Sequence, residues 1–289
     1  MTTPSQERST AVLEALGLHV EYGRHVYDTH STLDYLAGSD EDRLSDVNDA
    51  LRDPGIKAII ATRGGKGAYR IADGLDVEAA CRHPKLVVGF SEITILHMAL
   101  MKACGLVGIH GAAWDADSFG PRSAESFVRA VTTTEPIHIR STPDEHTHEL
   151  TTRGKANGRL IGGNQDSIAT AAGWALPDLG GAILLLEAVN LRLGHIDRQL
   201  TMLRNTGILK GIAGVAVGQY TGCGTGTDPT SNSRCTEIDV LRDRLTGLGV
   251  PVLGGLPIGH GEGPVALPIG TIATLDADAG TLTVESGVT

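Results

Sequence analysis

Residues 86–94 read LVVGFSEIT, a short apolar run rich in β-branched residues that turns through a glycine into an expected helix. Such a turn raises the hydroxyl of Ser91 above the sheet edge and leaves the next backbone N–H groups unpaired. One piece of local geometry therefore supplies a nucleophile and the donors for an oxyanion. The stretch predicts an α/β fold with Ser91 as its candidate nucleophile, although Ser91 taken alone could equally be a helix N-cap.

Two later strands also lead into side chains that can do chemistry. The apolar run over 183–186 ends on Glu187, and residues 252–260, VLGGLPIGH, carry His260 into a glycine-rich loop. In open α/β sheets the groups that meet a ligand lie beyond the carboxyl ends of the strands, so Ser91, Glu187 and His260 could converge. They would then act as nucleophile, orienting acid and general base.

Each of the two later residues also has a plainer interpretation. Glu187 could be the partner of an arginine at a strand end, and His260 could be an ordinary loop histidine. The carboxylate is the more informative of the two, because it follows four apolar residues directly and would be partly desolvated there. Desolvating a carboxylate is costly unless a donor meets it, so Glu187 implies a specific partner.

Strand and helix signals alternate along the chain, which predicts an α/β organisation in two units. We predict a first unit over 1–137, a connector over 138–157, which is polar and lacks clear periodicity, and a second unit over 158–289. The expected elements are helices over 3–17, 40–51, 68–75, 94–103 and 196–203, and strands over 18–22, 56–62, 86–89, 183–186 and 214–218.

The composition excludes several classes of protein. A chain of 289 residues with 41% hydrophobic content can bury a substantial core. A net charge of −10 and 3% aromatic residues argue against nucleic-acid binding. The four cysteines show no paired short spacing, so we expect buried free thiols in a reducing compartment. The N-terminus lacks the features of a signal peptide and no apolar run is long enough to span a bilayer, so we expect a cytoplasmic enzyme that does not bind membranes.

Two further motifs contain residue types that can bind ligands. The turn over 64–67, GGKG, could hold an anion with its N–H groups but lacks the spacing and the hydroxyl residue of a phosphate-binding Walker A loop. Its plainer interpretation is a tight turn. Residues 144–149, DEHTHE, do not form a metalloprotease motif and lie in the expected connector, so a solvated loop is favoured and no metal site is predicted.

Several co-linear motifs resemble the LD-carboxypeptidase family of serine peptidases, which includes murein tetrapeptide LD-carboxypeptidases and microcin C self-immunity proteins. The likeness runs from about Leu18 to Val284. The motifs that carry it lie at residues 64–65, 89–94, 158–164, 186–187, 196–198, 221–223 and 254–261.

The resemblance implies a triad of Ser91, Glu187 and His260 and an oxyanion hole built from the backbone N–H groups of Gly65 and Glu92. It also implies a Rossmann-like N-terminal domain with a smaller β-rich C-terminal α/β domain. The implied enzyme needs no metal and no cofactor and is commonly a homodimer. Its typical reaction removes the terminal D-alanine from murein tetrapeptide during cell-wall recycling.

The chain departs from the family pattern in two respects. The family usually has an aromatic residue at Lys66, an aspartate at Glu92 and a second acidic residue at Ala188, and these positions bear on substrate preference. Members also begin with a strand, whereas this chain opens on an expected helix. We expect either that the natural reading frame starts upstream or that the protein tolerates a sheet without that strand.

Two alternatives to murein peptide hydrolysis stay open. A hydrolase of aminoacyl-nucleotide conjugates would use the same chemistry, but base recognition favours a stacking aromatic near the cleft, and few aromatics besides Trp114 and Trp174 are available. A non-catalytic module could use the turn over 64–67 to hold an anion. An α/β-hydrolase is disfavoured because Ile93 replaces the second glycine of the GxSxG motif.

Overall fold

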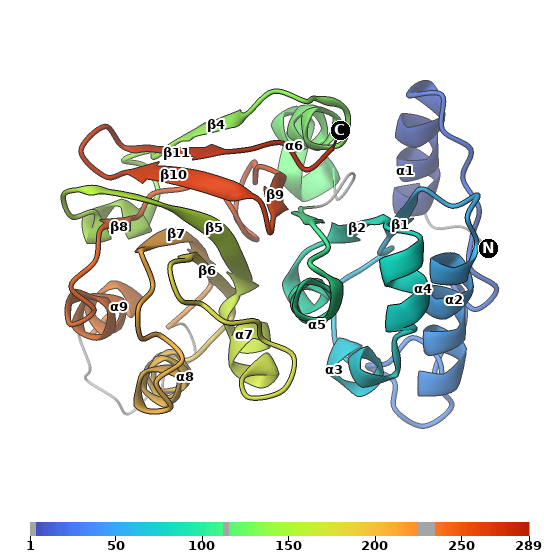
Figure 1. The fold of residues 1–289 in the computed structure, drawn as a ribbon, viewed down its shortest axis with the longest axis horizontal. Coiled ribbons are helices and arrows are strands. Elements are labelled where there is room, and N and C mark those ends of the chain that lie inside the picture. Colours follow the sequence, from blue (N-terminus) through green and yellow to red (C-terminus); the bar gives the residue numbers. More distant parts are fainter. Residues whose placement is uncertain (1–3, 112–115, 225–234, 289) are drawn as a thin grey trace.

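The computed structural model describes residues 4–111, 116–224 and 235–288, which form two α/β parts built on separate sheets (Figure 1). The first sheet has the order β1-β2-β3-β9, and the second has the order β4-β11-β10-β5-β6-β7-β8. Among the described residues, none of the helices combines the length and the apolar character that a membrane span requires.

The first sheet places the Ser91 turn at the end of its second strand. Three parallel strands, β1 (Ala58–Ile60), β2 (Leu86–Gly89) and β3 (Gly108–His110), are joined by the antiparallel β9 (Leu267–Ile269) from near the C-terminus. The helices of this part are α1 (Pro4–Ala15), α2 (Asp40–Arg52), α3 (Ala68–Ile71), α4 (Val77–Arg82), α5 (Thr94–Cys104) and α6 (Ala116–Thr132). The chain bends within α6 at Gly120, where the backbone is not helical.

The second sheet is organised around its longest strand, β5 (Lys155–Asn164). The first half of β5 pairs with the antiparallel β10 (Ile272–Asp276), and the second half pairs with the parallel β6 (Ile183–Val189). The remaining strands are β4 (Ile137–Arg140), β7 (Gly214–Thr221), β8 (Val252–Leu253) and β11 (Thr281–Val284), and the helices are α7 (Gln165–Ala171), α8 (Leu193–Asn205) and α9 (Glu237–Thr246). These three helices lie along one side of the parallel strands (Figure 1).

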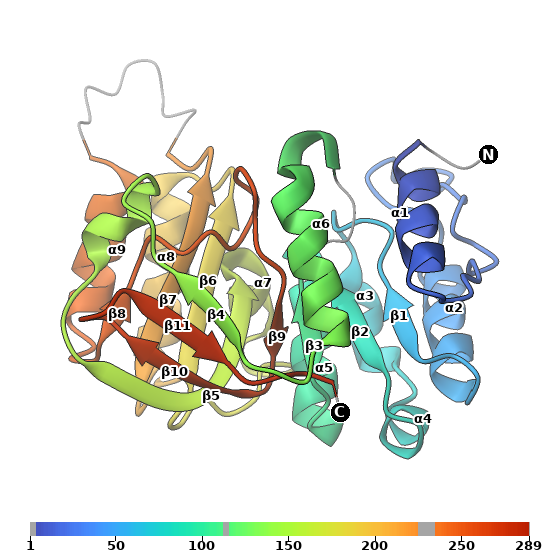
Figure 2. The ribbon, with the colours of Figure 1, turned by 90° about the horizontal axis from the view of Figure 1, so that it is seen from above.

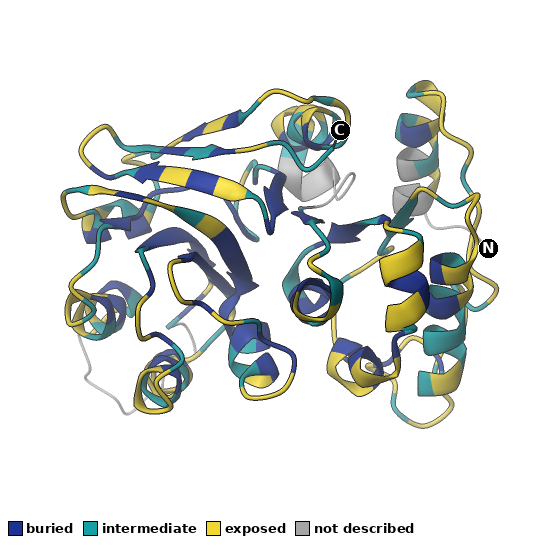
Figure 3. Ribbon diagram, viewed as in Figure 1, coloured by how far each residue is buried: buried dark blue, intermediate teal, exposed yellow. Residues whose placement is uncertain are grey.

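Apolar packing joins the two parts. One core cluster contains Val88 and Ile109 of the first sheet together with Leu184 and Val217 of the second. Helix α5 lies between the parts and contacts both α7 and β5 (Figure 2). Buried residues line the facing sides of the two parts, whereas exposed residues concentrate on the outer helices and on β10 (Figure 3). The parts are therefore held in a fixed relation by shared core packing.

Most predicted elements are confirmed, but strand lengths differ from the predictions: β1 is shorter, and β6 and β7 are longer. The helices expected over 40–51 and 94–103 correspond to α2 and α5, and the strand expected over 56–62 contains β1, although its residues are only half-buried. The helix expected over 68–75 is α3 followed by the 3-10 turn Ala72–Gly74.

Three predictions differ from the structure. Residues 18–22 are not a strand: Leu18 is 47% exposed and Tyr22 is 39% exposed, so the alternation there reflects no buried face. The expected connector over 138–157 contains most of β4, where buried Ile139 alternates with exposed neighbours, and also the start of β5. Only Cys223 is a buried thiol; Cys104 is half-buried, and Cys81 and Cys235 are exposed.

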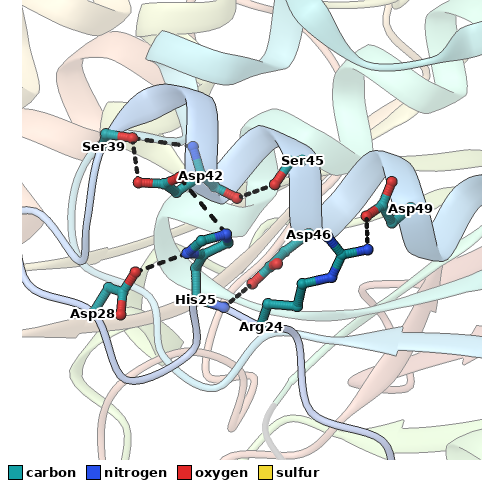
Figure 4. Close-up of polar contacts among 8 residues, drawn as sticks. All are labelled: Arg24, His25, Asp28, Ser39, Asp42, Ser45, Asp46 and Asp49. Carbon is teal, nitrogen blue, oxygen red and sulfur yellow. Dashed lines mark hydrogen bonds and ion pairs between the residues drawn. The ribbon is translucent and has the colours of Figure 1, made fainter.

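Polar contacts fasten the irregular segment after α1 to α2 (Figure 4). The imidazole of His25 lies between two carboxylates, with Nδ1 2.8 Å from Oδ2 of Asp28 and Nε2 3.6 Å from Oδ1 of Asp42. Its backbone N–H donates to Asp46 at 2.9 Å. The hydrogen bond to Asp28 raises the pKa of His25 from its ordinary value of 6.5, and the nearby charges of Asp42 and Asp46 add to the rise.

This arrangement predicts a stability that depends on pH. Because the pKa of His25 is raised by folding, its contribution is complete below about pH 6.5 and is lost as the pH rises through the higher value of the folded state. We expect His25→Asn to lower the melting temperature more at about pH 6 than at about pH 9. His19→Asn, at an exposed histidine, is the control, and equal pH profiles for the two variants would contradict the prediction.

Candidate functional site

Ser91 occupies a strained turn at the carboxyl end of β2. Its φ of 60° lies in the left-handed region, which is uncommon for a residue with a side chain. It starts the 3-10 turn Ser91–Ile93, which runs directly into α5. The N-cap position of α5 is held by Ile93, so the interpretation of Ser91 as the cap of that helix is wrong. Backbone strain at one serine is typical of a functional turn.

The glycine turn after β1 lies against this serine. A Cβ added to Gly64 would lie 3.0 Å from the Cβ of Ser91, tighter than an ordinary contact, so glycine favours this close approach of the loop. The next residue, Gly65, has a φ of 107°, which glycine adopts readily. The parallel pairing of β1 with β2 brings the ends of both strands to the same edge of the sheet.

The side chain of Glu92 links these two turns. Its buried carboxylate accepts the backbone N–H of Gly67 at 3.0 Å, and the N–H groups of Ala68 and Tyr69 also donate to it. Burial raises the pKa of Glu92, and the donated hydrogen bonds and the charge of Lys66 oppose that rise. The residue after Ser91 thus caps the first turn of α3 and fixes the loop that contains Gly65.

Glu187 and His260 form a hydrogen-bonded pair. Glu187 lies near the end of β6 with 0% of its surface exposed, and its Oε2 is 2.7 Å from Nδ1 of His260. Since the carboxylate accepts the proton on Nδ1, the free lone pair of a neutral ring is on Nε2. The specific partner that sequence reasoning required for this buried carboxylate is therefore a histidine rather than an arginine.

The loop that carries His260 is held by Gln219 of β7. The backbone N–H of Gly261 donates to Oε1 of Gln219 at 2.7 Å, and Nε2 of Gln219 donates to the carbonyl of Glu262 at 3.2 Å. A Cβ on Gly259 would lie 3.0 Å from Oε2 of Glu187, so glycine permits this approach. Sequence reasoning missed Gln219; its only available signal was its position near the end of a predicted strand.

Phe90 joins the serine turn to the Glu187–His260 pair. Its ring centroid is 4.7 Å from that of His260, and Phe90 immediately precedes Ser91. Phe90 also contacts His110. The two rings meet edge to face, with their centroids 6.2 Å apart. Burial, followed by the neighbouring His97 and His260, lowers the pKa of His110 to about 3. This ring is therefore neutral, and neither of its buried nitrogens has a hydrogen-bond partner among the described residues. Sequence reasoning did not identify it.

The second part of the chain also contacts the serine turn. The hydroxyl of Ser167 in α7 donates to the carbonyl of Ser91 at 3.4 Å. Asn164 caps α7, and its backbone N–H donates to Thr94 at 3.1 Å. The structure thus gathers the turns of Ser91 and Gly65 and the Glu187–His260 pair at the junction of the two sheets.

Two clusters contain residue types that often bind metal ions, but their side chains contact other protein groups. In the segment over 144–149, Nδ1 of His148 contacts the hydroxyl of Ser141 at 2.9 Å, and Glu149 pairs with Arg242 at 3.4 Å. His25, Asp28 and Asp42 offer ligand atoms within 4.8 Å of one another, but each ring nitrogen already faces a carboxylate. That geometry suits a protonated imidazole.

Comparison with known proteins gives a consistent result. Models of the LD-carboxypeptidase N-terminal and C-terminal domains match residues 2–111 and 157–275. A Streptomyces coelicolor protein is 40% identical over 287 residues, covering 97% of this chain and 89% of that protein. The probable murein peptide carboxypeptidase of Bacillus subtilis is 34% identical over 284 residues, covering 96% of this chain and 85% of its own.

The similarity extends to solved structures. Muramoyltetrapeptide carboxypeptidase from Oxalobacter formigenes has a TM-score of 0.81 at 28% identity, covering 97% of this chain and 94% of that chain. This confirms the predicted α/β fold of two domains. The microcin C7 self-immunity protein of Escherichia coli is 25% identical over 274 residues, covering 84% of this chain and 78% of that protein.

The bonds to Glu92 predict a cost for removing its carboxylate. Glu92→Ala leaves buried N–H groups at the start of α3 without their acceptor, which should lower the free energy of unfolding by about 1–3 kcal/mol. Glu92→Gln keeps an acceptor oxygen and should lose less. Urea denaturation of both variants measures this difference, and an alanine variant as stable as the glutamine variant would show that the cap contributes nothing.

Proposed function

Because the chain belongs to the LD-carboxypeptidase family, we propose that it is a serine carboxypeptidase whose nucleophile, general base and orienting acid are Ser91, His260 and Glu187. The observation that carries the proposal is the 2.7 Å bond between Nδ1 of His260 and buried Glu187. That bond leaves Nε2 of a neutral ring as the base, and contact with Phe90 keeps the ring beside the serine turn.

The proposed reaction proceeds through an acyl-enzyme. Nε2 of His260 takes the proton of Ser91 as the hydroxyl attacks the amide carbonyl, and Glu187 stabilises the resulting imidazolium. The backbone N–H groups of Gly65 and Glu92 hold the oxyanion, and the Glu92 carboxylate keeps the two turns that carry them together. The imidazolium protonates the leaving amine, and water then releases the acyl group.

The proposed substrate is a murein tetrapeptide that loses its terminal D-alanine in cell-wall recycling. The names of the Bacillus subtilis and Oxalobacter formigenes relatives support this substrate class. A cytoplasmic location and a homodimer belong to the same proposal, and both rest on the family resemblance and the sequence features.

Hydrolysis of aminoacyl-nucleotide conjugates is the second candidate, supported by the likeness to the microcin C7 self-immunity protein. Of the two tryptophans that could stack on a base, Trp114 lies outside the described residues. Trp174 follows α7, and its carbonyl accepts from Lys102 near the end of α5 that is remote from Ser91. The position of Trp174 favours the peptide over the nucleotide substrate.

Two assays test these alternatives. The protein is incubated with murein tetrapeptide and with an aminoacyl-adenylate amide, and released D-alanine or free nucleotide amine identifies the substrate class. Labelling with a fluorophosphonate separates both enzymes from a non-catalytic anion-binding module, which would not react.

Replacing the nucleophile should abolish turnover. Ser91→Ala removes the covalent route but should leave folding and substrate affinity largely intact, because Ser91 does not cap α5 and alanine is a small change. Steady-state hydrolysis and thermal melting measure the two effects. Turnover within about tenfold of the wild type would contradict the role of Ser91.

Replacing the orienting acid should lower the rate without unfolding the protein. Glu187→Gln can still contact His260, but a neutral amide does not stabilise the imidazolium, so we expect kcat to fall by about 10³–10⁴-fold. Glu78→Gln, which changes an exposed carboxylate of α4 that pairs with Arg82, is the control. A near-normal rate for Glu187→Gln would point to another orienting group.

A further inference from the structure

A cross-domain ion pair lies beside the nucleophile. Nζ of Lys66, in the loop after β1, is 3.4 Å from Oδ2 of Asp166, in the first turn of α7. The two residues are 100 positions apart, and their side chains are 54% and 38% exposed. The pair therefore connects the two parts of the molecule at a place that solvent reaches.

Both ends of this pair adjoin the serine turn. Lys66 follows Gly64 and Gly65, and a Cβ on Gly64 would touch Ser91. Asp166 precedes Ser167, whose hydroxyl donates to the carbonyl of Ser91. The charge of Lys66 is also felt by the buried carboxylate of Glu92, the residue after the nucleophile. The ammonium group thus belongs to the loop that packs against Ser91, on a side chain that solvent reaches.

The pair holds the lysine only weakly. An exposed ion pair at this separation contributes little to stability, so another anion can replace Asp166 at small cost. Asp166 has a second partner, since its Oδ1 accepts from Nε2 of Gln199 at 2.6 Å, and it would keep that hydrogen bond after losing Lys66. The chain has a net charge of −10, so a cation on this loop also offsets the repulsion of an anionic substrate.

We propose that Lys66 is the anion-binding group of the substrate site and that a bound substrate takes the place of Asp166 on its ammonium. This inference rests on the proposed function. It adds that the site recognises an anionic group of the substrate in addition to the scissile amide. The anion is the free carboxylate of a peptide or the phosphoryl group of an aminoacyl nucleotide, since either presents oxygens that an ammonium binds as a point charge.

Matched pairs of substrates test the proposal. One pair is a peptide with a free C-terminal carboxylate and the same peptide as its C-terminal amide. The other is an aminoacyl nucleotide phosphoramidate and the corresponding aminoacyl nucleoside amide without the phosphoryl group. For the anionic member, Lys66→Gln should raise KM by about tenfold or more with little change in kcat, while the neutral member is unaffected. The pair of substrates in which only the anionic member depends on Lys66 shows which anion Lys66 binds.

Two further variants sharpen the test. Asp166→Asn retains an acceptor for Gln199 but releases Lys66, so KM for the anionic substrate should fall severalfold. Lys57→Gln is the matched control. Lys57 comes directly before β1, whereas Lys66 follows that strand, and Lys57 donates to the carbonyl of Pro54. Equal KM values for Lys66→Gln and wild type, or a rise that is the same for anionic and neutral substrates, would overturn the proposal.

A binding measurement separates failure of this inference from failure of the proposed function. Calorimetry measures the binding of the free-acid peptide and of the aminoacyl nucleotide phosphoramidate to Ser91→Ala and to the double variant Ser91→Ala with Lys66→Gln. Weaker binding to the double variant supports the role of Lys66 even where the wild type hydrolyses nothing. Unchanged binding of both anionic ligands to the double variant overturns the role of Lys66, whatever the wild type hydrolyses.

Discussion

The hydrogen bond between Glu187 and His260 is the constraint on which the site depends. A fully buried carboxylate is costly unless a donor meets it, and Nδ1 of His260 is that donor at 2.7 Å. To bring the two together, the loop before β9 must approach the end of β6 closely, which the glycine at Gly259 permits and the side chain of Gln219 secures. The requirement to satisfy one buried charge thus sets the course of a whole loop.

The other half of the site depends on the strained turn at Ser91. A left-handed serine persists only where its surroundings hold it, and here Gly64 packs against it, Ser167 binds its carbonyl and Glu92 anchors the neighbouring loop. These contacts come from both parts of the chain, and shared core packing keeps the parts together. The geometry of the serine turn is therefore a property of the assembled molecule.

Sequence reasoning succeeded where the signal was local. The helices α2 and α5 follow from apolar spacing, and the turn at Ser91 follows from an apolar run, a glycine and a helix start. It failed over 18–22, where alternation did not correspond to a buried face, and over β4, where a short alternating strand lay within a polar stretch. Alternation alone does not show whether a neighbouring strand exists to cover one face.

The sequence by itself determined the fold class and three candidate residues, because each of Ser91, Glu187 and His260 comes after an apolar run typical of a strand, and strand ends converge in α/β sheets. Tertiary structure alone decided that β9 completes the first sheet, that Phe90 touches His260, and that Lys66 meets Asp166. Such contacts join positions far apart in the chain, and no local pattern encodes them. They arise only when apolar burial brings the two sheets together.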